Sequence, residues 1–149
     1  MIYFSNFEIF AKNKIYTLKK LYLDIDGVLL TAKQTKPAEN VVQFIDFITQ
    51  NFDCYWLTTH CKGDSNSALN YLAKYFENSI IEKLKTIKPT NWLTLKTEAI
   101  DFSSDFYWLD DYPFNAEIKI LNENSKINSL VIVDLNKTNE LNRIMTILV

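Results

Sequence analysis

Two carboxylates, Asp24 and Asp26, are separated by a single residue and directly follow an apolar run, and a second acidic pair, Asp110 and Asp111, follows another apolar run. In an extended chain, residues two apart point the same way, so Asp24 and Asp26 can reach one cation. Taken alone, Asp24 to Gly27 is also compatible with an ordinary acidic turn, because Asp and Gly are common in turns. If both acidic pairs meet in the fold, however, the carboxylates must share a cation. A hard divalent ion with oxygen ligands, Mg²⁺ above all, is the expected partner.

A threonine, Thr58, follows a third apolar run, and Lys88 and Lys96 precede the second acidic pair. Such a set of residues suits phosphoryl transfer, in which a metal neutralises a phosphate while the nucleophile approaches in line. An aspartate can be that nucleophile, and a second aspartate two residues on can act as general acid and base. A threonine hydroxyl and a lysine ammonium would hold the remaining phosphate oxygens.

The elements that must position these residues alternate along the chain. Apolar runs predict strands, and helical spacing of apolar residues predicts helices between them. The apolar runs are continuous rather than alternating, which is typical of a mainly parallel α/β sheet covered on both faces. We expect strands at 20–25, 52–57, 106–109 and 130–133 and a short strand at Ile80–Ile81. We expect helices at 38–51, 65–76, 95–100 and 136–148, the second capped by Ser65 or Asn66 and the third by Thr94.

In such sheets ligands bind beyond the carboxyl ends of the strands, near a switch in strand order. The three polar clusters, which are Asp24/Asp26, Thr58/Thr59 and Asp110/Asp111, each follow a predicted strand. We therefore expect the clusters to converge at one edge of the sheet.

Length and composition predict one folded domain over residues 1–149. The chain is 48% hydrophobic and 23% charged, with a net charge of -2. This balance makes nucleic acid an improbable partner, and the absence of a long apolar run in the sequence argues against a membrane span. Cys54 and Cys61 are predicted to be reduced thiols, and the order of apolar and basic residues at the N-terminus is wrong for a signal peptide, so we expect a cytoplasmic protein.

The order of these motifs resembles the haloacid dehalogenase superfamily of phosphatases. The resemblance covers about residues 20 to 135 and consists of Asp24-Ile25-Asp26-Gly27-Val28, then Thr58, then a lysine, then Asp110-Asp111. It implies a Rossmann-like three-layer sandwich and a Mg²⁺-dependent phosphomonoester hydrolase that works through a phosphoaspartate. The substrate would be a phosphorylated compound of unknown class.

The resemblance also implies a role for each motif residue. Asp24 would be the nucleophile, Asp26 the general acid and base, and Thr58 and a lysine would bind the phosphate. Lys96 is favoured over Lys88 for that lysine because it opens a predicted helix just before the last acidic strand.

For the metal, the resemblance implies Mg²⁺ bound by Asp24, Asp110 and the main-chain carbonyl of Asp26, with Asp111 supporting it.

The loop after Thr58 contains further candidate substrate contacts. Thr59, His60 and Lys62 lie there, and His60 is the only histidine in the chain. A solvated side chain is the alternative for each of them. Gly27 and Gly63 are the only glycines and lie in the two motif loops. Glycine is required where the chain needs a positive φ or close approach to a ligand.

The intervals between motifs are too short for a cap domain of the usual size, so we expect an uncapped, open site. Within the family such sites are associated with large substrates or with oligomers, and the aromatic segment Ile2 to Phe10 is a candidate for contact in a homo-oligomer. Residues 1–19 could instead form a hairpin or an edge extension. Two other functions stay open at this point: a phosphoacceptor signalling domain, which the chain order of the acids disfavours, and a catalytically silent binding module of the same fold.

Overall fold

The structure is a computed structural model that describes residues 17–149. The predicted oligomer contact at Ile2 to Phe10 lies outside the described residues, and so does most of the hairpin or edge extension predicted at 1–19; residues 17–19 precede β1 without regular secondary structure.

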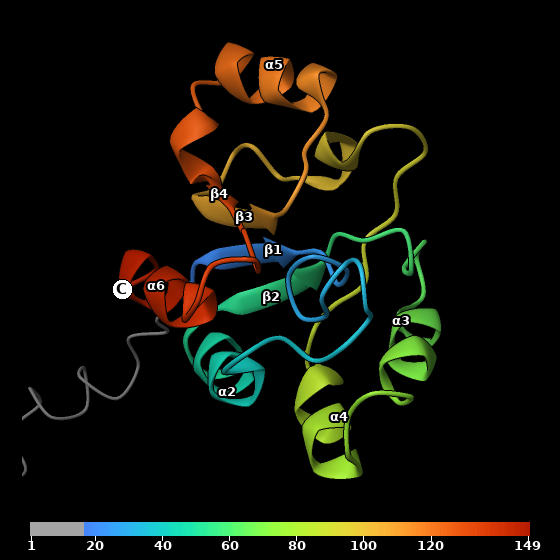
Figure 1. The fold of residues 1–149 in the computed structure, drawn as a ribbon. Helices are drawn as coiled ribbons and strands as arrows, with labels where there is room; N and C mark the ends of the chain where they lie inside the picture. The colour runs from blue at the N-terminus through green and yellow to red at the C-terminus, as the bar shows by residue number, and fades with distance from the viewer. Residues whose placement is uncertain (1–16) are drawn as a thin grey trace, which may run out of the picture.

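A four-stranded sheet lies at the centre of the described chain (Figure 1), and all of its strands are parallel. The strands are β1 (Lys20–Leu23), β2 (Asp53–Trp56), β3 (Phe106–Asp110) and β4 (Leu130–Ile132), in the spatial order β2-β1-β3-β4. The first strand, β1, lies inside the sheet; the chain then adds β2 on one side and returns to add β3 and β4 on the other. The switch in strand order therefore falls between β1 and β3.

Helices cover both faces of the sheet, which confirms the predicted α/β three-layer architecture. In Figure 1, α2 (Val41–Asn51), α4 (Asn78–Leu84) and α6 (Glu140–Ile147) lie on one side, and α5 (Asn115–Glu123) lies on the other. The remaining helical segments are α3 (Ser65–Leu72) and the 3₁₀ helices η1 (Lys96–Ala99) and η2 (Ile127–Ser129). Within residues 17–149 these elements account for the domain and leave no separate cap.

Alternation along each strand divides the core between the two faces. On β1, Leu21 and Leu23 belong to the cluster on the α2 face, whereas Tyr22 packs with Trp108 and Leu121 on the α5 face. Side chains in a strand point to opposite faces in turn, so a strand covered on both sides must be apolar throughout. This is the physical reason for the continuous apolar runs in the sequence.

Several predicted elements differ in detail. Ile80–Ile81 is not a strand but part of α4, where Ile80, Ile81 and Leu84 form one buried helical face. Two adjacent β-branched residues favour a strand locally, but their spacing to Leu84 fits a helix. Helix α3 ends at Leu72 rather than near Phe76. Its N-cap is Asp64 rather than Ser65 or Asn66, and the Asp64 carboxylate accepts a hydrogen bond from the backbone N–H of Asn66 at 2.9 Å.

The helix predicted at 95–100 is only one 3₁₀ turn, η1, and the Thr94 side chain does not cap it as predicted. The carboxylate of Glu98 reaches back instead and accepts the backbone N–H groups of Thr94 at 2.9 Å and Leu95 at 2.5 Å. Helix α6 begins at Glu140, later than the predicted residue 136, and α5 was not predicted at all. No helix within the described residues has the length and apolar character needed to cross a membrane.

Candidate active site

The register of the sheet brings the motif residues to one edge. Leu23 is paired with Trp56 on one side and with Leu109 on the other. The segments that follow β1, β2 and β3 therefore leave the sheet side by side at its carboxyl edge. The backbone N–H of Asp24 donates to the carbonyl of Leu109 at 3.2 Å. Asp24 and Asp110 therefore lie side by side at the switch between β1 and β3, where parallel sheets bind ligands.

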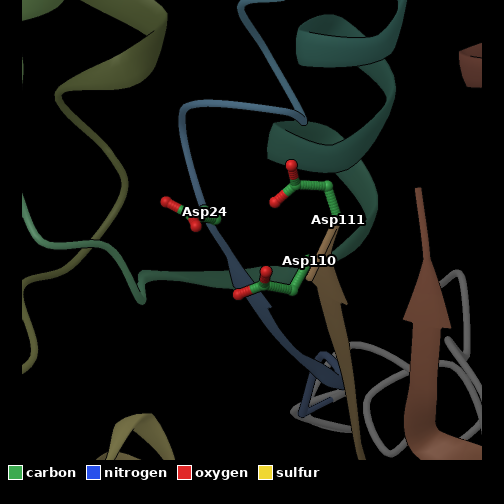
Figure 2. Close-up of side chains that lie close together, drawn as sticks. All are labelled: Asp24, Asp110 and Asp111. Carbon is green, nitrogen blue, oxygen red and sulfur yellow. The ribbon is translucent and has the colours of Figure 1, made fainter. Parts of the chain in front are cut away.

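Three carboxylates form an acidic cluster at this edge (Figure 2). One carboxylate oxygen from each of Asp24, Asp110 and Asp111 lies within 4.8 Å of the other two. The ammonium of Lys96 bridges two of them, at 2.6 Å from Asp24 Oδ2 and 2.6 Å from Asp110 Oδ2. The Lys96 and Asp24 side chains are 13% and 14% exposed and that of Asp110 is 3% exposed, so the bridge is largely shielded from water.

Burial and mutual repulsion shift the proton affinities in the cluster. Burial, opposed by the Lys96 ammonium, raises the pKa of Asp24. Burial also raises the pKa of Asp111, with the negative charges of Asp110 and Asp24 adding to the effect. Burial alone would lower the pKa of Lys96, but the attraction of Asp24 and Asp110 outweighs it and raises that pKa. The protein thus favours a cation at this position and resists further negative charge.

The charge and chemistry of the cluster fit a divalent cation. Three ionised carboxylates against one ammonium leave a formal charge of -2, which a divalent ion would neutralise. All the acidic groups are oxygen donors, as Mg²⁺ prefers. Two of the oxygens are already oriented by the backbone: Asp24 Oδ1 accepts the N–H of Ile25 at 2.7 Å, and Asp110 Oδ1 accepts the N–H of Tyr112 at 3.0 Å. Asp24, Asp110 and Asp111 are the side chains that could hold the ion.

Gly27 allows Asp111 to approach the turn after β1. Its φ of +83° lies in the left-handed region, and a Cβ built on it would lie 2.2 Å from Asp111 Cγ. No other residue type could keep this backbone conformation and leave the Asp111 carboxylate where it is. The predicted need for glycine at this position therefore has a structural basis in the acidic cluster.

Lys96 is held in place by a buried glutamate that sequence reasoning missed. Glu117, 2% exposed in the first turn of α5, accepts the backbone N–H of Lys96 at 2.7 Å and that of Phe114 at 2.8 Å. One carboxylate thus joins the start of α5 to the start of η1. The available signal was a glutamate three residues after the helix N-cap, a pattern that commonly marks a helix start.

The two candidate lysines, Lys88 and Lys96, have different partners in the structure. Lys88 forms an ion pair with Asp53 at 2.8 Å, and its side chain is 56% exposed. Asp53 is the first residue of β2, at the end of the strand opposite to Thr58. Lys96 reaches the acidic cluster, as preferred on sequence grounds, and Lys88 does not.

The predicted residues after β2 have different surroundings. Thr58 is fully buried, and its Oγ1 accepts the backbone N–H of His60 at 3.3 Å, whereas Thr59 is exposed. The ammonium of Lys62 donates to the carbonyl of Trp92 at 3.0 Å and lies 3.1 Å from the centre of the Trp92 ring. Roles for Thr59 and Lys62 in substrate binding stay predictions.

Asp26 does not add its carboxylate to the acidic cluster. Its Oδ2 lies 2.8 Å from His60 Nε2, and its Oδ1 accepts the hydroxyl of Tyr71 at 2.9 Å. The predicted contribution of Asp26 to the metal site, through its main-chain carbonyl, stays a prediction. Tyr71 carried no sequence signal, because it is one of eight tyrosines and lies within an ordinary helical pattern.

A pocket of about 510 Å³ opens beside Gly27 and Asp111. Its other walls come from the turn after β1, including Lys33 and Gln34, and from the segment after β4, including Asn136. The acidic cluster therefore borders a space that can hold part of a small molecule.

A scan of protein-family models and searches of curated proteins and of solved structures found no match to this chain.

Proposed function

We propose that this protein is a Mg²⁺-dependent phosphomonoester hydrolase of the haloacid dehalogenase type, working through a phosphoaspartate. The observation that carries the proposal is the ammonium of Lys96 at 2.6 Å from both Asp24 and Asp110, beside Asp111, at the switch point of a parallel sheet. A lysine alone does not neutralise three carboxylates, and a phosphate ester needs cationic partners before a carboxylate can approach it.

In the proposed reaction, Asp24 and Asp26 have separate tasks. The Asp24 carboxylate attacks phosphorus, the bond from phosphorus to the leaving oxygen breaks, and Asp26 gives its proton to that oxygen. Asp26 then takes a proton from a water molecule, whose oxygen attacks the phosphoaspartate and releases phosphate and free Asp24. When bound, Mg²⁺ would neutralise phosphate charge and orient the phosphoryl group.

Lys96 and Thr58 have supporting roles in the proposal. Lys96 orients Asp24 for attack and attracts the phosphate oxygens, and the polar groups of the Thr58 loop hold the oxygens on the opposite side. Thr58 is buried, so a contact with phosphate requires the phosphate to reach down to the end of β2.

An open site suits bulky phosphate esters. Over residues 17–149 no cap covers the carboxyl ends of the strands, and the pocket beside Asp111 could hold part of the leaving group. We further propose that the protein is cytoplasmic, in line with the free, buried thiols of Cys54 and Cys61.

The test is a hydrolysis screen with p-nitrophenyl phosphate and a panel of metabolite phosphates, with Mg²⁺ and with a chelator. The proposal predicts phosphate release that needs Mg²⁺ and is lost in Asp24→Asn. Asp105→Asn is the matched control, because the Asp105 side chain is 84% exposed and precedes β3 at its far end. Full activity of Asp24→Asn would refute the mechanism.

A further inference from the structure

Asp26 is held by two side chains that come from separate parts of the fold. Its Oδ1 accepts the hydroxyl of Tyr71 at 2.9 Å, and its Oδ2 lies 2.8 Å from His60 Nε2. An ionised carboxylate can only accept hydrogen bonds, so in that state the hydroxyl and the Nε2–H both donate to Asp26. Both carboxylate oxygens are therefore engaged, and the orientation of the group is defined.

The two partners of Asp26, His60 and Tyr71, also pack against each other. The rings of His60 and Tyr71 stack with their centres 3.8 Å apart and their planes 11° from parallel. Tyr71 lies near the end of α3, where its ring meets that of Tyr75 edge to face at 5.5 Å. The backbone N–H of His60 is bound to Thr58 Oγ1. The pair thus connects the turn after β1 to the loop after β2 and to α3.

Such support matters because Asp26 is otherwise accessible to solvent. Its side chain is 40% exposed, compared with 14% for Asp24 and 3% for Asp110. An exposed aspartate samples several rotamers, and proton transfer needs the donor within hydrogen-bond reach of the accepting atom. A pair of hydrogen bonds removes that freedom without burying the group.

We propose that His60 and Tyr71 are positioning residues that hold the Asp26 carboxyl group where it exchanges its proton with the leaving oxygen and with the attacking water. This inference rests on the proposed phosphatase function. The sequence suggested that His60 contacts substrate, whereas the geometry gives it a partner inside the protein. Burial and the hydrogen bond to Asp26 raise the pKa of Tyr71 to about 12, so its hydroxyl remains a donor at neutral pH.

Substrates with different leaving groups separate this role from a purely structural one. p-Nitrophenolate leaves readily without a proton, whereas the alkoxide of glycerol 2-phosphate needs one. Complete loss of general acid–base catalysis costs roughly 10²–10⁴-fold, so loss of one positioning contact should cost about tenfold. In Tyr71→Phe and His60→Ala we expect kcat/KM to fall about tenfold for glycerol 2-phosphate and to change little for p-nitrophenyl phosphate.

The second half of the reaction gives an independent readout. If Asp26 is poorly placed as a base, hydrolysis of the phosphoaspartate slows, and both variants should release a burst of p-nitrophenol equal to the enzyme concentration. His60→Gln, which keeps an N–H donor on its side chain, should recover part of the loss. Tyr55→Phe is the matched control, because it removes a hydroxyl that donates to another carboxylate, Asp53 Oδ2, also at 2.9 Å. Its kinetics should equal those of the wild type.

Melting temperatures of all the variants check that each is folded. Equal losses with both substrates would overturn the inference, and so would a rise in KM alone, which would make His60 a substrate contact. Unchanged kinetics in both Tyr71→Phe and His60→Ala would also overturn it. A wild-type protein inactive on both substrates with Mg²⁺ would instead overturn the proposed function and the inference together.

Discussion

Replacing Lys96 with methionine removes the ammonium that bridges Asp24 and Asp110 while keeping most of the side-chain volume. The ammonium lies 2.6 Å from both Asp24 and Asp110, and its side chain is 13% exposed. The backbone N–H of Lys96 can still donate to Glu117, so η1 should keep its place. The substitution therefore isolates the loss of the positive charge.

The cost follows from burial. Breaking a buried ion pair typically costs about 3–5 kcal/mol, because the partner charge is left uncompensated. We expect Lys96→Met to lower the free energy of unfolding by about 3 kcal/mol in the absence of divalent ions, measured by urea unfolding with circular dichroism. Mg²⁺ should recover part of this loss, because it supplies positive charge to the same carboxylates.

The pH dependence of that loss has a definite sign. Burial already raises the pKa of Asp24, and removing the ammonium raises it further. A carboxyl group whose pKa is raised in the folded state favours folding when it is protonated, so its unfavourable effect grows as pH rises through the folded pKa. The difference between Lys96→Met and the wild type should therefore shrink as the pH falls from 7.5 toward 5.

Lys88→Met is the control for the loss of a lysine as such. Its ammonium pairs with Asp53 at 2.8 Å, but its side chain is 56% exposed, and exposed pairs contribute roughly 0–1 kcal/mol. It should retain both stability and turnover. If Lys96→Met were as stable as Lys88→Met at pH 7.5 without Mg²⁺, the electrostatic account of the cluster would be refuted.

Three further outcomes are expected. Gly27→Ala should lower the free energy of unfolding by about 1–3 kcal/mol, because the new Cβ displaces Asp111. It should also weaken the stabilisation by Mg²⁺ measured by thermal shift, and an unchanged response to Mg²⁺ would contradict this. Glu117→Gln should cost about 1–2 kcal/mol in urea and reduce turnover, because glutamine has one acceptor oxygen and cannot accept from the backbone N–H groups of both Lys96 and Phe114. Turnover equal to that of the wild type would count against its role. Burial raises the pKa of Cys54 to about 12, so this thiol should react with a disulfide reagent at pH 8 only after unfolding; rapid labelling of the native protein would be the opposite result.

The sheet could be predicted from the sequence because strands that are buried on both faces appear in it as continuous apolar runs. Strands covered by helices on each side are apolar on both faces rather than at alternate positions, and the four apolar runs found in this way correspond to β1 to β4. The convergence of Asp24 and Asp110 followed from the same argument, since the carboxyl ends of parallel strands meet at one edge. Short segments were less predictable, because Ile80 and Ile81 favour a strand locally and only their packing with Leu84 makes the helix.

The supporting residues of the site could not be predicted from types and spacing. Glu117 and Tyr71 act through contacts 21 and 45 residues away in sequence, with Lys96 and Asp26 respectively. The residue types around Glu117 and Tyr71 do not indicate these partners, because the contacts depend on where α5 and α3 pack. The orientation of Asp26 toward His60 likewise depends on the loop after β2.

The most direct test of the central claim is to trap the phosphoaspartate. Borohydride added during turnover would reduce an acyl phosphate and convert the aspartate to homoserine, which peptide mass spectrometry locates. The account predicts that Asp24 alone is modified, and only when both substrate and Mg²⁺ are present. Sustained Mg²⁺-dependent hydrolysis with an unmodified Asp24, or modification at a different aspartate, would contradict it.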